Sequence, residues 1–245
     1  MNPDARAELA ALCSRGLEWR THPSRVLPPS AAVRRAAVLV LFGVLDSVPA
    51  RASVVPPDGA SVTGGAGRGP FGPPAPGFVA PDLDVLLLRR AATLGSHPSQ
   101  IAFPGGRLEP ADDGPVAAAV REAVEETGVD RSGVDVLGTL PELPLAASHH
   151  LVTPVVAWWT RPSQVAAVDH DETVEVFRVP VADLVEPENR AYTLHVMGPE
   201  TLRMPAFTVQ GRLVWGFTAL VLSRLFDELG WAEPWDHDRV VQPDS

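Results

Sequence analysis

The segment from Phe103 to Gly128 constrains the fold of this chain most strongly. It opens with Phe103-Pro104-Gly105-Gly106, passes through Asp112-Asp113-Gly114-Pro115 and continues as Val116 to Thr127 until Gly128. Acidic residues before a Gly-Pro pair are typical of a helix N-cap followed by a first-turn proline, and a glycine suits the left-handed residue that ends a helix. We therefore expect a loop, a capped helix and a glycine stop, in that order.

This helix has one apolar side and one acidic side. At about 100° per residue, Glu122, Glu125 and Glu126 fall within an arc of about 100°, opposite apolar residues such as Val116 and Val120. Carboxylates at this spacing repel by roughly 0.2 to 0.5 kcal/mol per pair, near a helix end where the dipole disfavours anions. Because fold stability does not require them, the pattern favours a site for a hard divalent cation such as Mg²⁺ or Mn²⁺.

Short apolar runs elsewhere predict a sheet, and helical patterns flank them. The predicted strands are Val38–Leu45, Val85–Leu88, Val134–Leu140, Val152–Trp159, Val174–Val179, Tyr192–Val196 and Phe207–Trp215, the last folded around a Gln210-Gly211 turn. The other predicted helices are an N-terminal one over about residues 3–16, a short one at Pro180–Val185, and Phe217–Leu229 ended by Gly230. These elements predict one α/β domain over residues 1–245, with a mixed sheet covered by helices on both faces.

Three other segments carry expectations of their own. Residues 56–81 are rich in Gly and Pro and are expected to form a long irregular loop that is dispensable for folding. The polar C-terminal tail, about residues 233–245, is expected to be frayed. Trp158 and Trp159 are expected to divide between core and surface.

Composition excludes several classes of function. The net charge is −10, no basic cluster is present, and all 20 basic residues are arginines, so we expect no nucleic-acid binding, no Schiff-base lysine and no lysine-dependent P-loop. The single cysteine, Cys13, excludes an internal disulfide, and residues 1–19 lack the apolar core of a signal peptide. The longest apolar run is about half of a membrane span, so we expect a cytoplasmic protein without a membrane partner. A homodimer is compatible with the sequence.

The central segment closely resembles the Nudix box of the Nudix hydrolase superfamily. Gly106 is followed after six residues by Asp113 and, after seven more, by the run Arg121-Glu122-Ala123-Val124-Glu125-Glu126-Thr127-Gly128-Val129. The box usually has a glutamate at the position of Asp113 and one residue fewer before it. The resemblance implies a Nudix-type α/β/α sandwich with a mixed central sheet.

Flanking residues are similar to the coenzyme A pyrophosphatase branch of that superfamily. The similarity rests on Arg90, Leu94, Ser96-His97, Gln100-Ile101 and Phe103–Gly106 upstream, and on Val214-Trp215-Gly216-Phe217-Thr218-Ala219 downstream. Where the branch usually has Thr, Ser, Arg and Gly, this chain has Leu88, Ala91, Gly95 and Ser99. The change at Gly95 removes a cation that could contact a substrate phosphate.

The resemblance implies Mg²⁺- or Mn²⁺-dependent hydrolysis of a diphosphate linkage in a small nucleoside diphosphate derivative, with coenzyme A or an acyl-CoA as the branch substrate. It assigns Glu122, Glu125, Glu126 and the Gly106 carbonyl as metal ligands and Arg121 as the residue that orients a carboxylate. The general base is one of these glutamates or Glu175, and Arg90, His97, Gly105 and Gly106 are candidate substrate contacts. Two alternatives stay open: a Nudix hydrolase acting on nucleotide sugars, dinucleotides or nucleoside triphosphates, and a non-catalytic Nudix-fold module that binds a ligand.

Overall fold

The computed structural model describes residues 3–19, 33–44, 82–91, 100–145, 149–168, 173–197 and 200–243. The expectations about the loop at 56–81 and about Gly95, His97 and Ser99 fall outside these residues. No helix in the described ranges is both long and apolar enough to cross a membrane.

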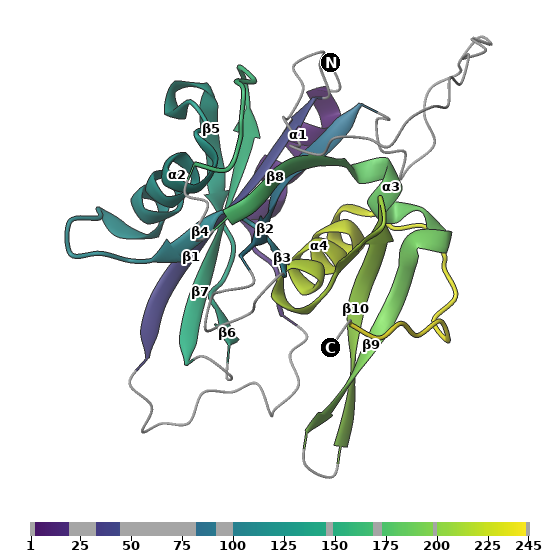
Figure 1. Ribbon diagram of the computed structural model, residues 1–245. Helices are drawn as coiled ribbons and strands as arrows, with labels where there is room; N and C mark the ends of the chain where they lie inside the picture. Colours follow the sequence, from purple (N-terminus) through teal and green to yellow (C-terminus); the bar gives the residue numbers. More distant parts are fainter. Residues whose placement is uncertain are drawn as a thin grey trace, which may run out of the picture.

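A mixed sheet forms the centre of the molecule (Figure 1). Its middle strand is β1 (Arg34–Val44), which runs parallel to β7 (His150–Trp159) and antiparallel to β2 (Leu83–Arg90). Next to β7 lie β5 (Val134–Thr139) and β6 (Leu143–Leu145), and the outer neighbour of β2 is β8 (Thr173–Pro180). The continuous apolar runs of β1 and β7 fit strands that are buried on both faces.

The sheet opens between β1 and β2, and residues 101–107 fill the opening. Only Phe42 to Val44 of β1 pair with β2, whereas Ala36 to Val38 pair with β4 (Gly105–Arg107). The other end of β2 pairs with β3 (Ile101–Ala102). The Gly105-Gly106 pair is thereby fixed within the sheet instead of lying in a free loop.

One face of the sheet packs against α2 (Gly114–Thr127). Ala37, Leu39 and Leu41 of β1 are fully buried in one cluster with Ala119 and Ala123 of α2. The alternation of strand side chains sends Val40 and Phe42 to the opposite face. The small residues of α2 let the helix approach the sheet closely, so its acidic residues stay near Gly106.

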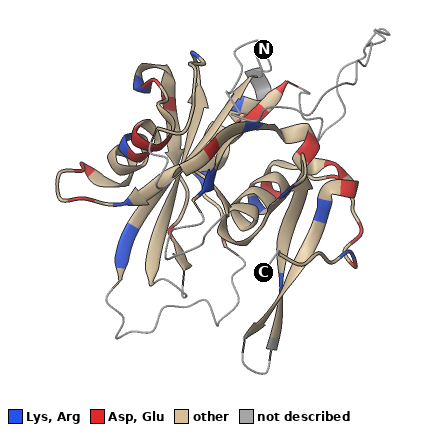
Figure 2. Cartoon of the chain, viewed as in Figure 1, with Lys and Arg blue, Asp and Glu red and all other residues tan. Residues whose placement is uncertain are grey.

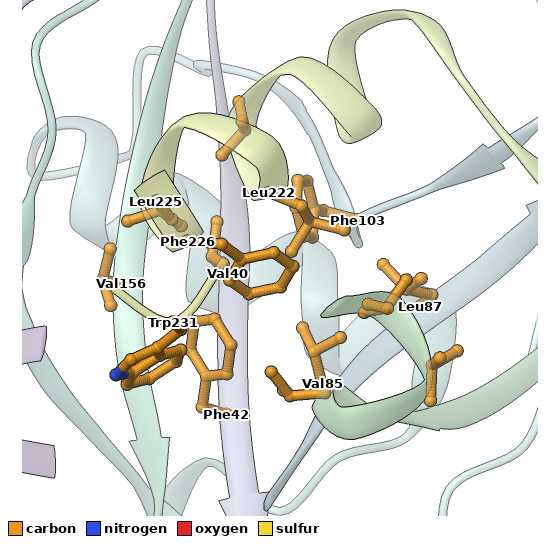
Figure 3. Close-up of a cluster of buried hydrophobic side chains, with 14 of the residues drawn as sticks. Val40, Phe42, Val85, Leu87, Phe103, Val156, Leu222, Leu225, Phe226 and Trp231 are labelled. Carbon is orange, nitrogen blue, oxygen red and sulfur yellow. The ribbon is translucent and has the colours of Figure 1, made fainter. Parts of the chain in front are cut away.

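The opposite face is covered by α1 (Pro3–Arg15), α3 (Val181–Val185) and α4 (Gly216–Leu229). Figure 3 shows this core, in which Phe42, Phe226 and Trp231 gather beside side chains of β1 and β2. The rings of Phe42 and Trp231 meet edge to face, with centroids 6.3 Å apart. Helices therefore cover both faces of the sheet, and the α/β sandwich predicted from the sequence is confirmed.

A second sheet packs on the outer side of α4 (Figure 1). It is antiparallel, with the order β11 (Arg212–Val214), β10 (Glu200–Val209) and β9 (Arg190–Met197). Phe207 of β10 and Phe226 of α4 are both fully buried, and their ring centroids are 6.1 Å apart. The core of the α4 face thus continues into the second sheet.

The C-terminal segment does not fray, so that expectation is wrong for the described residues up to 243. The Tyr192 amide donates to the Arg239 carbonyl, and the Val241 amide donates to the Tyr192 carbonyl, each at 2.9 Å. Trp235 packs against the Tyr192 ring with centroids 4.9 Å apart. Aromatic packing and backbone pairing along β9 offset the entropy of ordering this polar segment.

The other element predictions are confirmed with small shifts of their bounds, but four features differ. The short strands β3, β4 and β6 and the 3₁₀ turns η2 (Arg131–Gly133) and η4 (Pro187–Asn189) were not predicted, and β10 begins at Glu200, ahead of the predicted Phe207. Asp113 stands at the start of α2 but makes no side-chain capping hydrogen bond. Trp158 and Trp159 are both buried, one on each face of the sheet, so the predicted division between core and surface is wrong.

Candidate active site

The site is built where the Gly105-Gly106 strand meets the last turns of α2. Gly105 is pressed against β1, because a Cβ there would lie 2.6 Å from Val38 Cα and 2.8 Å from Val38 Cγ1. At Gly106 the space that a Cβ would occupy is taken by the Glu122 carboxylate, with Oε2 2.7 Å from that position. The two glycines therefore bring the strand backbone against β1 on one side and against an α2 carboxylate on the other.

Glu126 connects the end of α2 to this strand. The Gly105 amide donates to Glu126 Oε2 at 2.8 Å, and Glu126 is buried with 5% exposure. A buried carboxylate needs a donor, and the backbone amide supplies one. The predicted acidic face is consequently not uniform, because one of its three carboxylates points inward.

Arg121 holds the other two carboxylates. Its Nη1 donates to Glu122 Oε1 and to Glu125 Oε2, each at 3.0 Å. The Glu122 side chain is 17% exposed and that of Glu125 is 56% exposed. One guanidinium thus relieves the repulsion between two neighbouring glutamates and fixes their orientation.

Asp112 fixes Arg121 in turn. Arg121 Nε and Nη2 donate to the two Asp112 oxygens at 3.0 Å each, and Nη2 also donates to the Arg107 carbonyl at 3.1 Å. These hydrogen bonds, helped by the Glu109 amide, lower the pKa of Asp112, and the same bonds raise the pKa of Arg121. The result is a planar fork that joins the loop before α2 to the carboxylates of its third turn. In Figure 2 acidic and basic segments lie side by side along α2.

The carboxylates are adjacent but are not gathered around one point. In the part of the chain that the structure describes, no three His, Cys, Asp or Glu side chains converge closely enough to hold a metal ion. The donor set nevertheless has the chemistry that hard cations select, since Glu122, Glu125 and Glu126 offer only carboxylate oxygens and Glu122 lies directly against Gly106.

Glu175 lies on β8, across from Arg89 of β2. Its Oε2 is 3.4 Å from Arg89 Nε, and its Oε1 accepts a hydrogen bond from Arg212 Nη2. Both carboxylate oxygens thus face arginines. The prediction that Glu175 acts as a base stays a prediction, as does the prediction that Arg90, at the end of β2, contacts substrate.

Sequence reasoning missed three side chains. The sequence pattern predicts Asp112 only as part of the start of a helix. Asp112 and Asp113 lie nine and eight residues before Arg121, and this spacing is a signal that one of them can fold back and pair with the arginine. Arg89 and Arg212 carry no motif. Their pairing with Glu175 follows from the register of β2 with β8 and from the position of β11, which pattern analysis does not provide.

Comparisons of the sequence with a family model and with curated proteins agree on one family. The NUDIX domain family matches residues 74–197. Two proteins named "Uncharacterized Nudix hydrolase NudL" are similar to the chain. The one from Photorhabdus laumondii is 34% identical over 149 residues, which are 61% of this chain and 79% of that protein; the one from Cronobacter sakazakii is 35% identical over 151 residues, 61% and 77% of the two chains. A solved NUDIX hydrolase from Nitrosomonas europaea covers 90% of this chain and 85% of its own at 10% identity, with a TM-score of 0.44.

Proposed function

Because the chain belongs to the Nudix hydrolase family, we propose that it hydrolyses the diphosphate linkage of a nucleoside diphosphate derivative, with coenzyme A or an acyl-CoA as the first candidate substrate. The observation that carries the proposal is the joint placement of Glu122 against Gly106 and of Glu126 against the Gly105 amide. It brings two anionic side chains of α2 to one strand.

The proposed cofactor is Mg²⁺ or Mn²⁺. Glu122, Glu125 and Glu126 would hold it, together with the Gly106 carbonyl. Bound there, a divalent cation neutralises diphosphate charge and lowers the pKa of water. A cation is needed at this place because the negative charge of the carboxylates alone would repel an anionic substrate.

The remaining roles belong to the residues themselves. Arg121 keeps Glu122 and Glu125 oriented through the fork anchored by Asp112, and a glutamate of the site accepts the proton of the attacking water. Gly105 and Gly106 are proposed to contact substrate through the strand backbone, because the space of a side chain is taken by β1 at Gly105 and by the Glu122 carboxylate at Gly106. Arg90 and His97 are proposed substrate contacts.

Support for the coenzyme A branch comes from residues outside the box, namely Arg90 and the segment from Gln100 to Gly106. A contact within the fold further supports the branch assignment, because it connects the downstream segment, Val214 to Ala219, with the upstream one. The Thr218 hydroxyl in the first turn of α4 donates to the Ile101 carbonyl at 3.0 Å. The downstream and upstream segments of the resemblance are thus in direct contact, as expected if both serve one binding site.

The test is incubation of the purified chain with coenzyme A, nucleotide sugars and dinucleotides, with Mg²⁺ and separately with Mn²⁺. Products are identified by mass. Coenzyme A split into adenosine 3′,5′-bisphosphate and 4′-phosphopantetheine supports the proposal. Turnover of a nucleotide sugar alone would replace the substrate class, and no turnover of any diphosphate would overturn the proposed reaction.

A further inference from the structure

Three charged residues form a second cluster, away from α2, where β2 and β8 meet β11. It consists of Arg89, Glu175 and Arg212, and we call it the Arg89–Arg212 cluster. Glu175 is 9% exposed and lies between the two arginines, which keep 43% and 25% of their side chains exposed. Arg212 also rests on the ring of Phe177, with its guanidinium carbon 4.6 Å from the ring centroid.

The cluster carries more positive charge than its own partners neutralise. Among the residues that the structure describes, two guanidiniums share one carboxylate here, which gives these three side chains a summed charge of +1 in a chain of net charge −10. Arg89 Nε is buried and, within the described structure, makes an ion pair with Glu175 Oε2 at 3.4 Å but no hydrogen bond. The buried Thr173 hydroxyl, two residues before Glu175, also has no hydrogen-bond partner there. A buried polar group without a hydrogen bond carries a desolvation cost, so both groups favour a role beyond fold stability for this end of β2 and β8.

The backbone at this place is irregular as well. The register between β2 and β8 shifts between Arg89 and Arg90, opposite Glu175 and Thr173. Bulges of this kind re-aim side chains and are frequent beside binding sites. Here the extra residue is Val174 of β8, so the shift lies directly beside Glu175.

The cluster is close to the candidate active site along the chain. Arg89 pairs with Ile101 of β3, and the four residue steps from Ile101 to Gly105 span at most about 14 Å. Figure 2 shows the basic end of β2 between α2 and α4. The backbone of Arg89 is thus near the Gly105-Gly106 strand, while its side chain lies on the α4 face of the sheet with Leu87 and Phe177.

We propose that Arg89 and Arg212 bind a phosphate monoester of the substrate, distinct from the diphosphate that is cleaved, and that Glu175 is a positioning residue that holds the two guanidiniums side by side. This inference rests on the proposed function and deepens it: the substrate carries a third phosphate, as coenzyme A does at its ribose 3′ position. The cluster supplies the cation that the sequence lacks at Gly95.

The test compares coenzyme A with 3′-dephospho-coenzyme A, which differs only in that phosphate. Arg89→Gln and Arg212→Gln should each raise the KM for coenzyme A by about tenfold or more, the usual effect of losing one charge-assisted contact, with kcat retained. Neither variant should change the KM for the dephospho compound. Arg131→Gln, at an exposed arginine of η2, is the matched control. An equal KM increase for both compounds would overturn the assignment.

Glu175→Gln separates positioning from catalysis. A positioning role predicts a raised KM for coenzyme A only. A large fall in kcat with both compounds would show instead that Glu175 is the base predicted from the sequence, and would overturn the positioning role. Thermal melts establish that each variant is folded, and Arg89→Lys and Arg212→Lys, which keep the charge, should recover part of the affinity.

A binding experiment keeps this proposal independent of hydrolysis. Calorimetry without added metal should show that adenosine 3′,5′-bisphosphate binds about tenfold more tightly than AMP, and that Arg89→Gln abolishes the difference. If no diphosphate is hydrolysed but this preference is present, the proposed function fails and the phosphate site stands. Equal binding of the two nucleotides would refute the phosphate site.

Discussion

The Gly105 amide nitrogen donates a hydrogen bond to Glu126 Oε2 at 2.8 Å, which connects the strand before α2 to the last turn of that helix. The two residues are 21 positions apart, and this bond fixes the angle between strand and helix. Glu126 of the candidate site therefore also stabilises the fold. Substitutions can test the effect of its charge separately from that of its hydrogen bond.

Glu126→Gln and Glu126→Ala should differ in stability. The amide oxygen of glutamine still accepts from Gly105, so its free energy of unfolding should stay close to that of the wild type. Alanine leaves a buried N–H unpaired and should lower it by about 1 to 3 kcal/mol. Urea unfolding followed by circular dichroism measures both. Equal stabilities for glutamine and alanine would show that the hydrogen bond does not stabilise the fold.

Gly105→Ala and Gly106→Ala should fail in different ways. A Cβ at Gly105 overlaps the backbone of β1, so the free energy of unfolding of this variant should fall by about 1 to 3 kcal/mol, the usual cost of overpacking a core. A Cβ at Gly106 meets only the end of the Glu122 side chain, which can move. That variant should keep most of its stability and lose hydrolysis. The reverse pattern in paired melts and assays would contradict the geometry.

Removing Asp84 should be costly. Its carboxylate pairs with Arg178, the two side chains are 1% and 5% exposed, and Arg178 also lies over the Trp159 ring. Asp84→Ala leaves a buried cation without its partner and should cost about 3 to 5 kcal/mol. Asp135→Ala, which breaks the exposed pair with Arg6, is the control and should cost at most about 1 kcal/mol.

The Cys13 thiol should be unreactive in the folded protein. Burial raises its pKa from 9.0 to about 11. Since the thiolate is the reactive form, alkylation at pH 8 should be much slower in native than in denatured protein. A group whose pKa is raised by folding stabilises the fold below its unfolded pKa and loses that contribution as pH rises through the folded value. The stability difference between wild type and Cys13→Ala should therefore change between about pH 9 and pH 11; no change in this window would contradict the shift.

Pattern analysis was sufficient where burial alone decides the structure. The apolar runs of β1 and β7 and the glycine stop at Gly128 are local signals, and the structure reproduces them, with Gly128 at a φ of 68°. Three features depend on contacts distant in sequence. The short strands β3 and β4 form only because β1 and β2 separate. Asp112 rather than Asp113 pairs with Arg121, and the C-terminal segment is ordered because β9 offers a free edge.

The sequence predicts which residues form the candidate site, but it does not predict how their side chains are arranged. The helical spacing places three glutamates on one face but does not say that Glu126 turns toward Gly105 or that Arg121 joins Glu122 to Glu125. Those relations arise from packing of α2 against the sheet, which sets the distance to the glycine strand.

The most direct measurement of the central claim is steady-state hydrolysis of a diphosphate substrate with Mg²⁺ by wild type, Glu122→Gln and Glu126→Gln, with thermal melts on the same preparations. Loss of one ligand charge should reduce kcat by orders of magnitude. Each variant should melt close to the wild type, because the glutamine oxygen can still accept from Arg121 at position 122 and from the Gly105 amide at position 126. Near-normal turnover by either variant would contradict the claim that these carboxylates perform the chemistry.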